Sequence, residues 1–423
     1  MACALAIAAA AAFSCLAPRA TVFLLVLVAL AAAWVVLPAP GDWRRTLKTP
    51  VIATGGLLLL YMAASALWAL DPAAAAAKVT GVAAVAGCAL LAFAALDRLD
   101  RGTTERTALI FLAGAAAGAL LVASEFATGQ AITRLLFNLF PVLRPEGNKD
   151  LAVSDGEVFQ IAHYELNRNI AVLVLTLWPA LLVLTRQRAV SARLPLALAA
   201  AALTAILAFV SDHQTSMIAI VVGAAVLLAA RVNARAVGRA VTAAWCLAFL
   251  LVIPASLAAY HKAELQHAKW LPSTARARII IWNFTAEKVA QHPFLGIGVR
   301  STRVLDAALL PNVKPDEGEV YAPRPGRHAH NLYLQSWFEL GLIGAGLVMA
   351  FGLAILSRLA AVAEPLQPFG YALFGAVMVI AGLAWGMWQT WLLAAYALSA
   401  LYLALGMRFA RFGLGGKETR PNQ

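Results

Sequence analysis

Long, uninterrupted runs of apolar residues recur along the whole chain and constrain its fold more than any other feature. The runs are about 16 to 24 residues long, the length that lets an α-helix cross a hydrocarbon layer of roughly 30 Å. Inside lipid, every backbone N–H and C=O must be paired within its own segment, so the runs are predicted to be helices. They are rich in Leu, Ala and Gly and lack the period-two alternation of a membrane barrel. We therefore predict an all-α polytopic membrane protein.

Composition supports this class. Hydrophobic residues make up 62% of the 423 residues and charged residues only 13%, whereas soluble proteins are nearer one half and one quarter. The four cysteines lie in apolar runs without CxxC spacing, which indicates inert thiols and no disulfide framework. The net charge of +12 lies in short clusters at the ends of runs, as membrane topology requires. No nucleic-acid partner is expected.

Twelve spans are expected, of which the third and fourth form a hairpin at Asp71-Pro72. The run at 2–17 lacks the charged segment of a signal peptide and is followed at once by another span, so it is kept as a helix. The expected spans are 2–17, 20–38, 51–70, 73–96, 107–125, 170–185, 196–211, 215–231, 240–260, 331–357, 369–386 and 388–407. The domains are then helices one to five (1–125), a first outer segment (126–169), helices six to nine (170–260), a large outer loop (261–330), helices ten to twelve (331–407) and a tail (408–423).

Positive charge predicts the orientation. Alternate loops are rich in Lys and Arg, and we place them in the cytoplasm together with both chain ends. These residues are Arg44, Arg45, Lys48, Arg98, Arg101, Arg106, Arg186, Arg188, Arg193, Arg231, Arg235, Arg239, Arg358, Arg408, Arg411, Lys417 and Arg420. The two long segments then face outward, into the periplasm if the membrane is a bacterial inner membrane.

Both outer segments are basic. The first carries Arg134, Arg144, Lys149 and Arg168, and the second carries ten Lys or Arg residues. Long loops can be translocated despite positive charge, so these residues do not contradict the orientation. A basic outer loop suits an anionic ligand such as a phosphate group. Snorkelling of the side chains to lipid headgroups also explains most of them.

The end of the second loop places two histidines, His328 and His330, directly before the tenth span, which Asn331 opens. A neutral imidazole accepts a proton near pH 7, so either histidine could be a general base. Two histidines at i and i+2 could instead bind a metal, but no HExxH motif or acidic partner at helical spacing is nearby, and no metal is expected. The residues alone do not decide between His328 and His330.

Arg276 and Arg278 lie in a mixed apolar and charged stretch that predicts an amphipathic helix on the membrane surface. It should begin with Ser273 or Thr274 as N-cap and end before His292. Both arginines lie in the first turn, where the helix dipole favours anions. A helix N-terminus with two arginines could therefore bind a diphosphate, and Arg276 and Arg278 are candidates for this role.

Two smaller polar features lie at membrane edges. Asn167 and Arg168 open the sixth span, and Asp212 and His213 interrupt the apolar stretch between spans seven and eight. Polar residues at membrane depth usually face a cavity or a partner, which makes Asn167, Arg168 and His213 candidates for substrate contacts. A plain hairpin turn explains residues 212–216 equally well.

Taken together, these features resemble the O-antigen ligase and polymerase superfamily of bacterial envelope glycosyltransferases. His330-Asn331 is followed by Gly341 and Gly344, close to the ligase pattern. The stretch from Arg278 through Trp282 to Gly298 is similar to the family's Arg…Trp…Pro-x-x-Gly-x-Gly block. The resemblance covers roughly residues 165–350.

The resemblance implies a GT-C-like glycosyltransferase architecture and a ligase activity. Such ligases move a glycan from undecaprenyl diphosphate to the lipid A-core oligosaccharide in the periplasm, without a metal or other cofactor. If the acceptor hydroxyl attacks in a single step, with a histidine as general base, the anomeric centre is inverted. The family's essential histidine corresponds to His330 and its loop arginine to Arg276 or Arg278. Where the family commonly has a second arginine, this chain has Asp212-His213, and Arg168 is the candidate substitute. His328 and Asn331 are further candidates for substrate contacts.

Three other activities compete with this interpretation. An O-antigen polymerase or a protein-glycosylating oligosaccharyltransferase would use similar residues on a different acceptor. A transporter of lipid-linked glycans would need ionisable residues along the span centres, where Lys78 is the clearest case. It would also leave the long outer loops without a role, as would a purely structural membrane protein.

Overall fold

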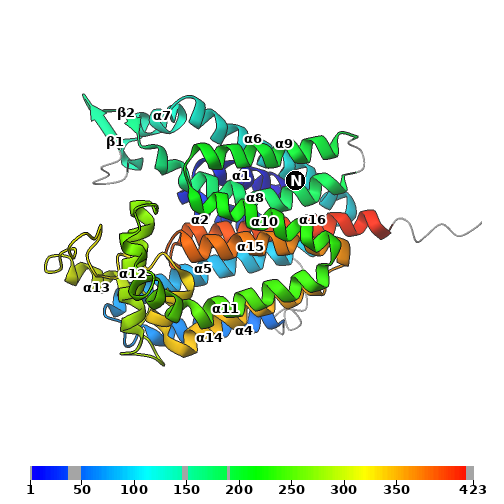
Figure 1. The fold of residues 1–423 in the computed structure, drawn as a ribbon. Coiled ribbons are helices and arrows are strands. Elements are labelled where there is room, and N and C mark those ends of the chain that lie inside the picture. Colours follow the sequence, from blue (N-terminus) through cyan, green and yellow to red (C-terminus); the bar gives the residue numbers. More distant parts are fainter. Residues whose placement is uncertain (1, 37–48, 145–150, 188–190, 416–423) are drawn as a thin grey trace, which may run out of the picture.

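The computed structural model describes residues 2–36, 49–144, 151–187 and 191–415 as a bundle of long apolar α-helices (Figure 1). Each expected span contains one helix. They are α1 (Ala2–Leu16), α2 (Thr21–Val36), α4 (Pro50–Ser65), α5 (Pro72–Leu96), α6 (Arg101–Ala127), α8 (Asn167–Arg186), α9 (Arg193–Val210), α10 (Gln214–Val232), α11 (Ala234–His261), α14 (Leu332–Ala360), α15 (Gln367–Leu383) and α16 (Thr390–Gly415). Among the described residues, ten helical segments are long and apolar enough to cross a membrane, and α1 and α4 contribute two shorter apolar helices. The all-α polytopic membrane fold is confirmed.

Some boundaries differ from those expected. The last helix, α16, continues to Gly415, so it runs into the segment 408–423 that was expected to be a tail. Several of the basic residues named in the sequence analysis lie outside the described residues. These are Arg44, Arg45, Lys48, Lys149, Arg188, Lys417 and Arg420.

The two long outer segments lie at the same end of the bundle, opposite the C-terminal end of α16 (Figure 1). The first segment contains α7 (Ala131–Leu139) and an antiparallel hairpin, β1 (Leu151–Ser154) and β2 (Glu157–Ile161), that was not expected. Asp155 and Gly156 both have positive φ and form its two-residue turn, the backbone that suits a hairpin. The second segment contains α12 (Ser273–Val289) and α13 (Ser301–Leu309).

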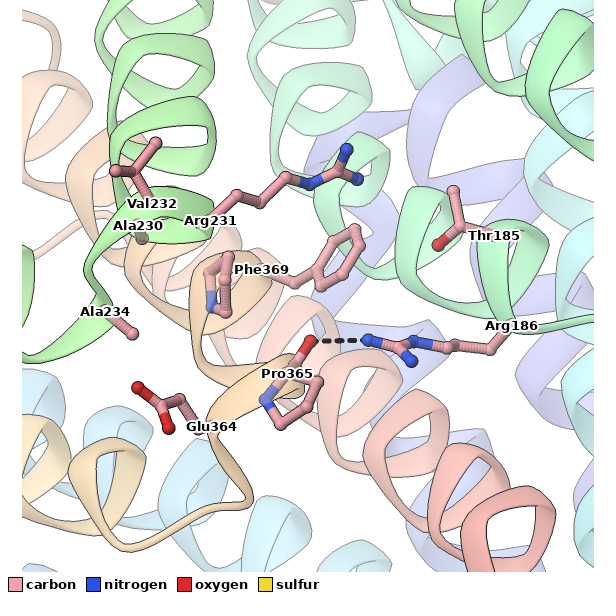
Figure 2. A pocket seen from close by; sticks show the side chains of 10 residues that line it. Thr185, Arg186, Ala230, Arg231, Val232, Ala234, Glu364, Pro365 and Phe369 are labelled. Carbon is pink, nitrogen blue, oxygen red and sulfur yellow. Dashed lines mark hydrogen bonds between the residues drawn. The ribbon is translucent and has the colours of Figure 1, made fainter.

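Short 3-10 helices join several of these elements: η1 (Pro18–Ala20), η2 (Pro141–Leu143), η3 (His163–Leu166), η4 (Leu265–His267) and η5 (Glu364–Leu366). The last of them, η5, leads from α14 into α15 at the end of the bundle away from α12. There it borders a cavity together with the ends of α8 and α10 (Figure 2).

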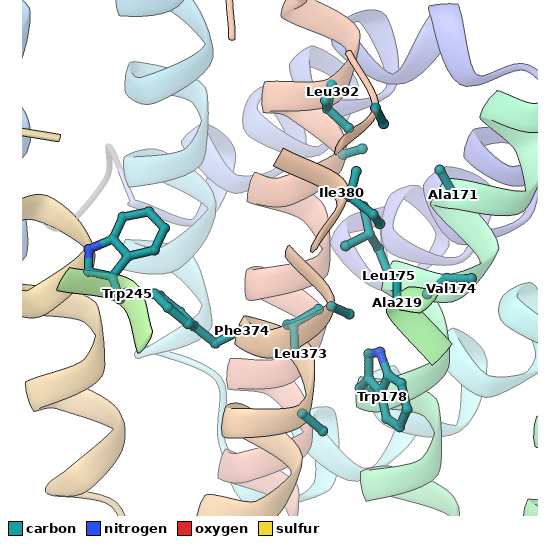
Figure 3. Packing of buried hydrophobic residues seen from close by; sticks show 14 of the residues in the cluster. Ala171, Val174, Leu175, Trp178, Ala219, Trp245, Leu373, Phe374, Ile380 and Leu392 are labelled. Carbon is teal, nitrogen blue, oxygen red and sulfur yellow. The ribbon is translucent and has the colours of Figure 1, made fainter. Parts of the chain in front are cut away.

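The core is centred on α15, which packs between α8 and α10 on one side and Trp245 of α11 on the other (Figure 3). Helices in lipid associate through close packing and hydrogen bonds, so small residues matter at their contacts. A side chain at Gly223 of α10 would lie only 2.2 Å from the Trp178 ring of α8. Trp245 packs edge-on against Tyr333 and Phe374, and its indole N–H donates to the Met349 carbonyl at 2.9 Å. This packing fixes the start of α14 relative to α15.

A break in α14 at Gly341 determines how the large outer loop is attached. Gly341 has φ 64° and ψ −166°, a backbone region that is essentially restricted to glycine. Residues 293–298 lie across the break and hydrogen-bond to residues 338–343, an arrangement that we call the clasp. The N–H of Leu342 donates to the Pro293 carbonyl at 2.8 Å, and the N–H of Gly298 donates to the Glu339 carbonyl at 2.8 Å. The loop therefore satisfies backbone groups that the broken helix leaves free.

Substitution of Gly341 by Ala should destabilise the protein. A Cβ at this position would lie 2.3 Å from the Phe294 carbonyl oxygen, and the backbone strain alone costs roughly 1–3 kcal/mol. Thermal unfolding in detergent should show a lower Tm. Gly346→Ala is the matched control, because Gly346 has open space around it in the same helix and Ala favours helix. Equal Tm values for the two variants would contradict the clasp.

Candidate functional site

His330 lies immediately before α14 in a strained backbone conformation. Its φ of 53° is left-handed, which a non-glycine residue adopts only when its surroundings hold it there. Nδ1 of the ring lies 2.5 Å from the carbonyl oxygen of Ala384, at the end of α15. A carbonyl only accepts hydrogen bonds, so Nδ1 carries the proton and Nε2 keeps its lone pair. The fold thus presents His330 with Nε2 as a proton acceptor.

The segment around His330 is fixed from two sides. Asn331 is the N-cap of α14, and its side-chain oxygen accepts the N–H of Leu334 at 3.1 Å. The indole of Trp282, on α12, donates to the Ala329 carbonyl at 2.8 Å. Asn331 was expected to contact substrate, and the structure gives it a capping role that holds its neighbour.

Three histidines from two distant parts of the chain, His213 and the pair His328 and His330, lie near Arg278. The rings of His328 and His330 have centroids 4.1 Å apart. His213 precedes α10. Its ring lies tilted against the Trp385 ring, with centroids 5.3 Å apart, and its Nδ1 lies 2.7 Å from the Ser216 hydroxyl oxygen. We call His213, Arg278, His328 and His330 the histidine cluster. The distance in sequence between His213, Arg278 and the two loop histidines gives no indication that they form one cluster.

Electrostatics keep these histidines neutral at pH 7. Burial lowers the pKa of His330 to about 4; the Ala384 carbonyl opposes this shift and the charge of Arg278 adds to it. Burial and Arg278 likewise lower the pKa of His213 to about 4. Burial, the neighbouring His330 and several arginines lower the pKa of His328 to about 3. A neutral ring can accept a proton, although a low pKa makes it a weak base until a nearby charge changes.

Positive charge without a matching carboxylate surrounds the cluster. Arg278, Arg303 and Arg327 all act on His328, and within the described part of the chain none of the three forms an ion pair. Lys78 of α5, named above as the clearest ionisable residue in a span, lies within reach of Arg303. Unpaired cations at one end of the bundle create a field that attracts anions.

The two candidate arginines do not share one side of α12. They are two residues apart, so they project about 200° apart around the helix axis. Trp282, one turn beyond Arg278, contacts the histidine segment, and the charge of Arg278 acts on all three histidines. Arg276 has a buried Nε that finds no hydrogen-bond partner among the residues that the structure describes. The arrangement favours Arg278 over Arg276 as the arginine at the histidines.

The expected N-cap of this helix was wrong. The helix begins at Ser273 with Pro272 in the cap position, and no side chain caps it. Its end at Val289, before His292, is as expected. Ile279, Ile280 and Ile281 are buried, so α12 packs against the protein through this stretch.

The candidates at the sixth span are engaged elsewhere. Arg168 forms an ion pair with Glu165 at 2.9 Å, and Arg19 also approaches Glu165, at 3.7 Å. Asn169 donates to the carbonyls of Cys15 and Leu16, which joins α8 to α1. Asn167 has a buried side-chain oxygen without a hydrogen-bond partner among the described residues. Substrate contacts by Asn167 and Arg168 stay predictions.

Sequence reasoning missed Glu339, a fully buried carboxylate of α14. It accepts the N–H of Arg300 at 2.6 Å, the N–H of Thr302 at 3.2 Å, the Gln335 amide and the Trp388 indole. It thereby caps α13 and ties it to α14. A Glu inside an apolar run is costly and was the available signal.

The turn between α15 and α16, residues 384–389, was also missed. It supplies the Ala384 carbonyl to His330, the Trp385 ring to His213 and the backbone of Gly386 against His328. Three tryptophans between 385 and 391 were the available signal. Within the described residues, no group of three or more His, Cys, Asp or Glu side chains is arranged to hold a metal.

Comparison with known proteins adds independent information. Residues 199–349, which include the histidine cluster and the clasp, match the family described as O-antigen ligase. A "Putative polysaccharide ligase" of Rickettsia bellii is 32% identical over 127 residues, 29% of this chain and 30% of the relative. A similarly named protein of Rickettsia typhi is 25% identical over 249 residues, 58% of each chain. Another, of Rickettsia felis, is 27% identical over 232 residues, 54% of this chain and 55% of that relative. The chain thus spans between about a third and somewhat over half of the length of these relatives.

Proposed function

We propose that this chain, which belongs to the O-antigen ligase superfamily, transfers a glycan from undecaprenyl diphosphate to the lipid A-core oligosaccharide of lipopolysaccharide. The reaction would take place on the periplasmic face of the bacterial inner membrane, with membrane lipids surrounding the helices. The observation that carries the proposal is the neutral, oriented His330 beside the unpaired Arg278, at the end of the bundle where a lipid-linked anion can reach them.

The proposed reaction is a single displacement. An acceptor hydroxyl oxygen attacks the anomeric carbon of the donor glycan, and its proton passes to Nε2 of His330. The bond between the anomeric carbon and the diphosphate oxygen breaks, and the electron pair leaves with undecaprenyl diphosphate. Attack from the face opposite the leaving group inverts the anomeric centre. Arg278 stabilises the charge that develops on the departing diphosphate.

Donor binding would activate the base. The positive charge of Arg278 contributes to the low pKa of His330. A diphosphate beside Arg278 offsets that charge, so the pKa of His330 rises when the donor is bound. The Ala384 carbonyl oxygen accepts the hydrogen bond from Nδ1–H throughout and stabilises the imidazolium that forms. Because guanidinium groups supply the positive charge, the proposal needs no metal ion.

His330→Ala should abolish transfer. Loss of a general base costs typically 10²–10⁴-fold in rate. The measurement is transfer from a defined lipid-diphosphate donor to lipid A-core by purified protein in proteoliposomes. His267→Ala is the matched control, because His267 is an exposed residue of the same outer loop. His328→Ala should retain more transfer than His330→Ala, because Nε2 of His328 is buried.

Wild-type transfer by His330→Ala would remove this residue from the mechanism. A product on carrier-linked glycan would identify a polymerase, and a product on peptide would identify an oligosaccharyltransferase. Product on neither acceptor, with transbilayer movement of the donor, would identify a transporter. Reversible inhibition by EDTA would contradict the metal-independent reaction.

Arg278→Ala should weaken use of the donor more than use of the acceptor, whereas Arg276→Ala should have the smaller effect. The reason is that Arg278 lies at the histidines and Arg276 projects from another side of α12. A charge-assisted contact is worth about 1.5–3 kcal/mol, so KM for the donor should rise roughly ten- to a hundredfold. The two KM values are measured in the same assay. A larger effect of Arg276→Ala would reverse the assignment.

A further inference from the structure

A groove lies between α11 and α14 at the end of the bundle opposite His330, with a cavity of about 670 Å³. Its lining from α11 recurs at spacings of three and four residues, as one helical stripe does. The lining residues of α11 are Arg235, Gly238, Arg239, Thr242, Ala243 and Cys246. From α14 come Leu353, Leu356, Ser357 and Ala360, with Glu364, Gln367 and Tyr371 beyond them.

The groove has a charged end and an apolar end. From Arg235 to Cys246, α11 rises about 16 Å, roughly half of the hydrocarbon thickness of a membrane. Arg235 and Arg239 stand where the helix begins, and Ala243, Cys246 and Leu353 line the deeper part. This order matches a phospholipid, which has a charged headgroup at the surface and an apolar chain that runs inward.

Arg235 and Arg239 have no side-chain partner among the described residues. Both are exposed, and within the described part of the chain neither Arg235 nor Arg239 forms an ion pair or a side-chain hydrogen bond. They also stand near the N-terminus of α11, where the helix dipole is unfavourable to cations and favourable to anions. An anion between them would relieve both effects.

The neighbouring cavity, of about 500 Å³, extends the same positive surface (Figure 2). Arg186 and Arg231 project into it from α8 and α10; Arg186 donates to the Pro365 carbonyl at 2.6 Å and Arg231 lies over the Phe369 ring. Glu364 borders both cavities and is the one carboxylate among the residues that line them. Four arginines around one carboxylate leave this end of the bundle strongly positive.

We propose that the groove is a binding site for an anionic phospholipid of the leaflet opposite the His330 site. The lipid phosphate lies between Arg235 and Arg239, and one acyl chain follows Ala243, Cys246 and Leu353 between α11 and α14. Basic pockets between helices are typical sites for anionic headgroups. The site is separate from the proposed glycan transfer, so either can fail without the other.

Native mass spectrometry of the full chain, purified with a defined mixture of phosphatidylglycerol and phosphatidylethanolamine, tests the proposal. Wild type should retain phosphatidylglycerol preferentially. Arg235→Ala with Arg239→Ala should bind it roughly thirtyfold more weakly, as expected for two lost contacts with lipid phosphate. Cys246→Phe should also lose it, because the larger side chain fills the apolar end while both arginines remain.

The matched control is Arg106→Ala with Arg193→Ala, which removes the same charge at exposed sites outside both cavities. This variant should retain phosphatidylglycerol as wild type does. An equal loss in the control, or no lipid preference in wild type, would overturn the proposal. Displacement of the lipid by millimolar inorganic phosphate would show a site for free phosphate instead, and retention by Cys246→Phe would show that the groove holds no acyl chain.

Discussion

The hydrogen bonds of the clasp are the interaction on which the candidate site depends. A helix in lipid cannot leave backbone groups unpaired, and α14 is broken at Gly341. Residues 293–298 occupy the break, so the outer loop is attached to the membrane bundle through its backbone. Through this attachment α12 brings Arg278 and Trp282 against the segment that holds His330. Glu339 then joins α13 to the same part of α14.

Burial and the positive charge of Arg278 both lower the pKa of His330. Among the described residues, Arg278 forms no ion pair with a carboxylate. A base that is weak in the free protein and strengthens next to an anionic donor would act only once that donor is in place. Four arginines lie at the opposite end of the bundle, where they line two cavities. We propose a lipid-binding role for the groove there, and no catalytic role.

The fold could be predicted from sequence because the length of an apolar run is itself the physical requirement for a span. His330 could be nominated because it stands at a membrane entry and fits a family pattern. The contacts of the Ala384 carbonyl, the Trp385 ring and Glu339 could not be predicted, because their partners are distant in sequence. The rotation of α12 about its axis determines whether Arg276 or Arg278 lies near the histidines. Local sequence does not determine that rotation.

The central claim is that neutral His330, tuned by Arg278, accepts the proton. The pH dependence of kcat/KM tests it most directly, because that ratio reports the pKa of the essential base in the free enzyme. With a pKa of about 4 for His330, the rate should be constant above about pH 5 and fall below it. Arg278→Ala should move this fall to higher pH, since removing a positive charge raises the pKa. A wild-type fall centred near the ordinary histidine pKa of about 6.5, or one that Arg278→Ala leaves in place, would contradict the claim.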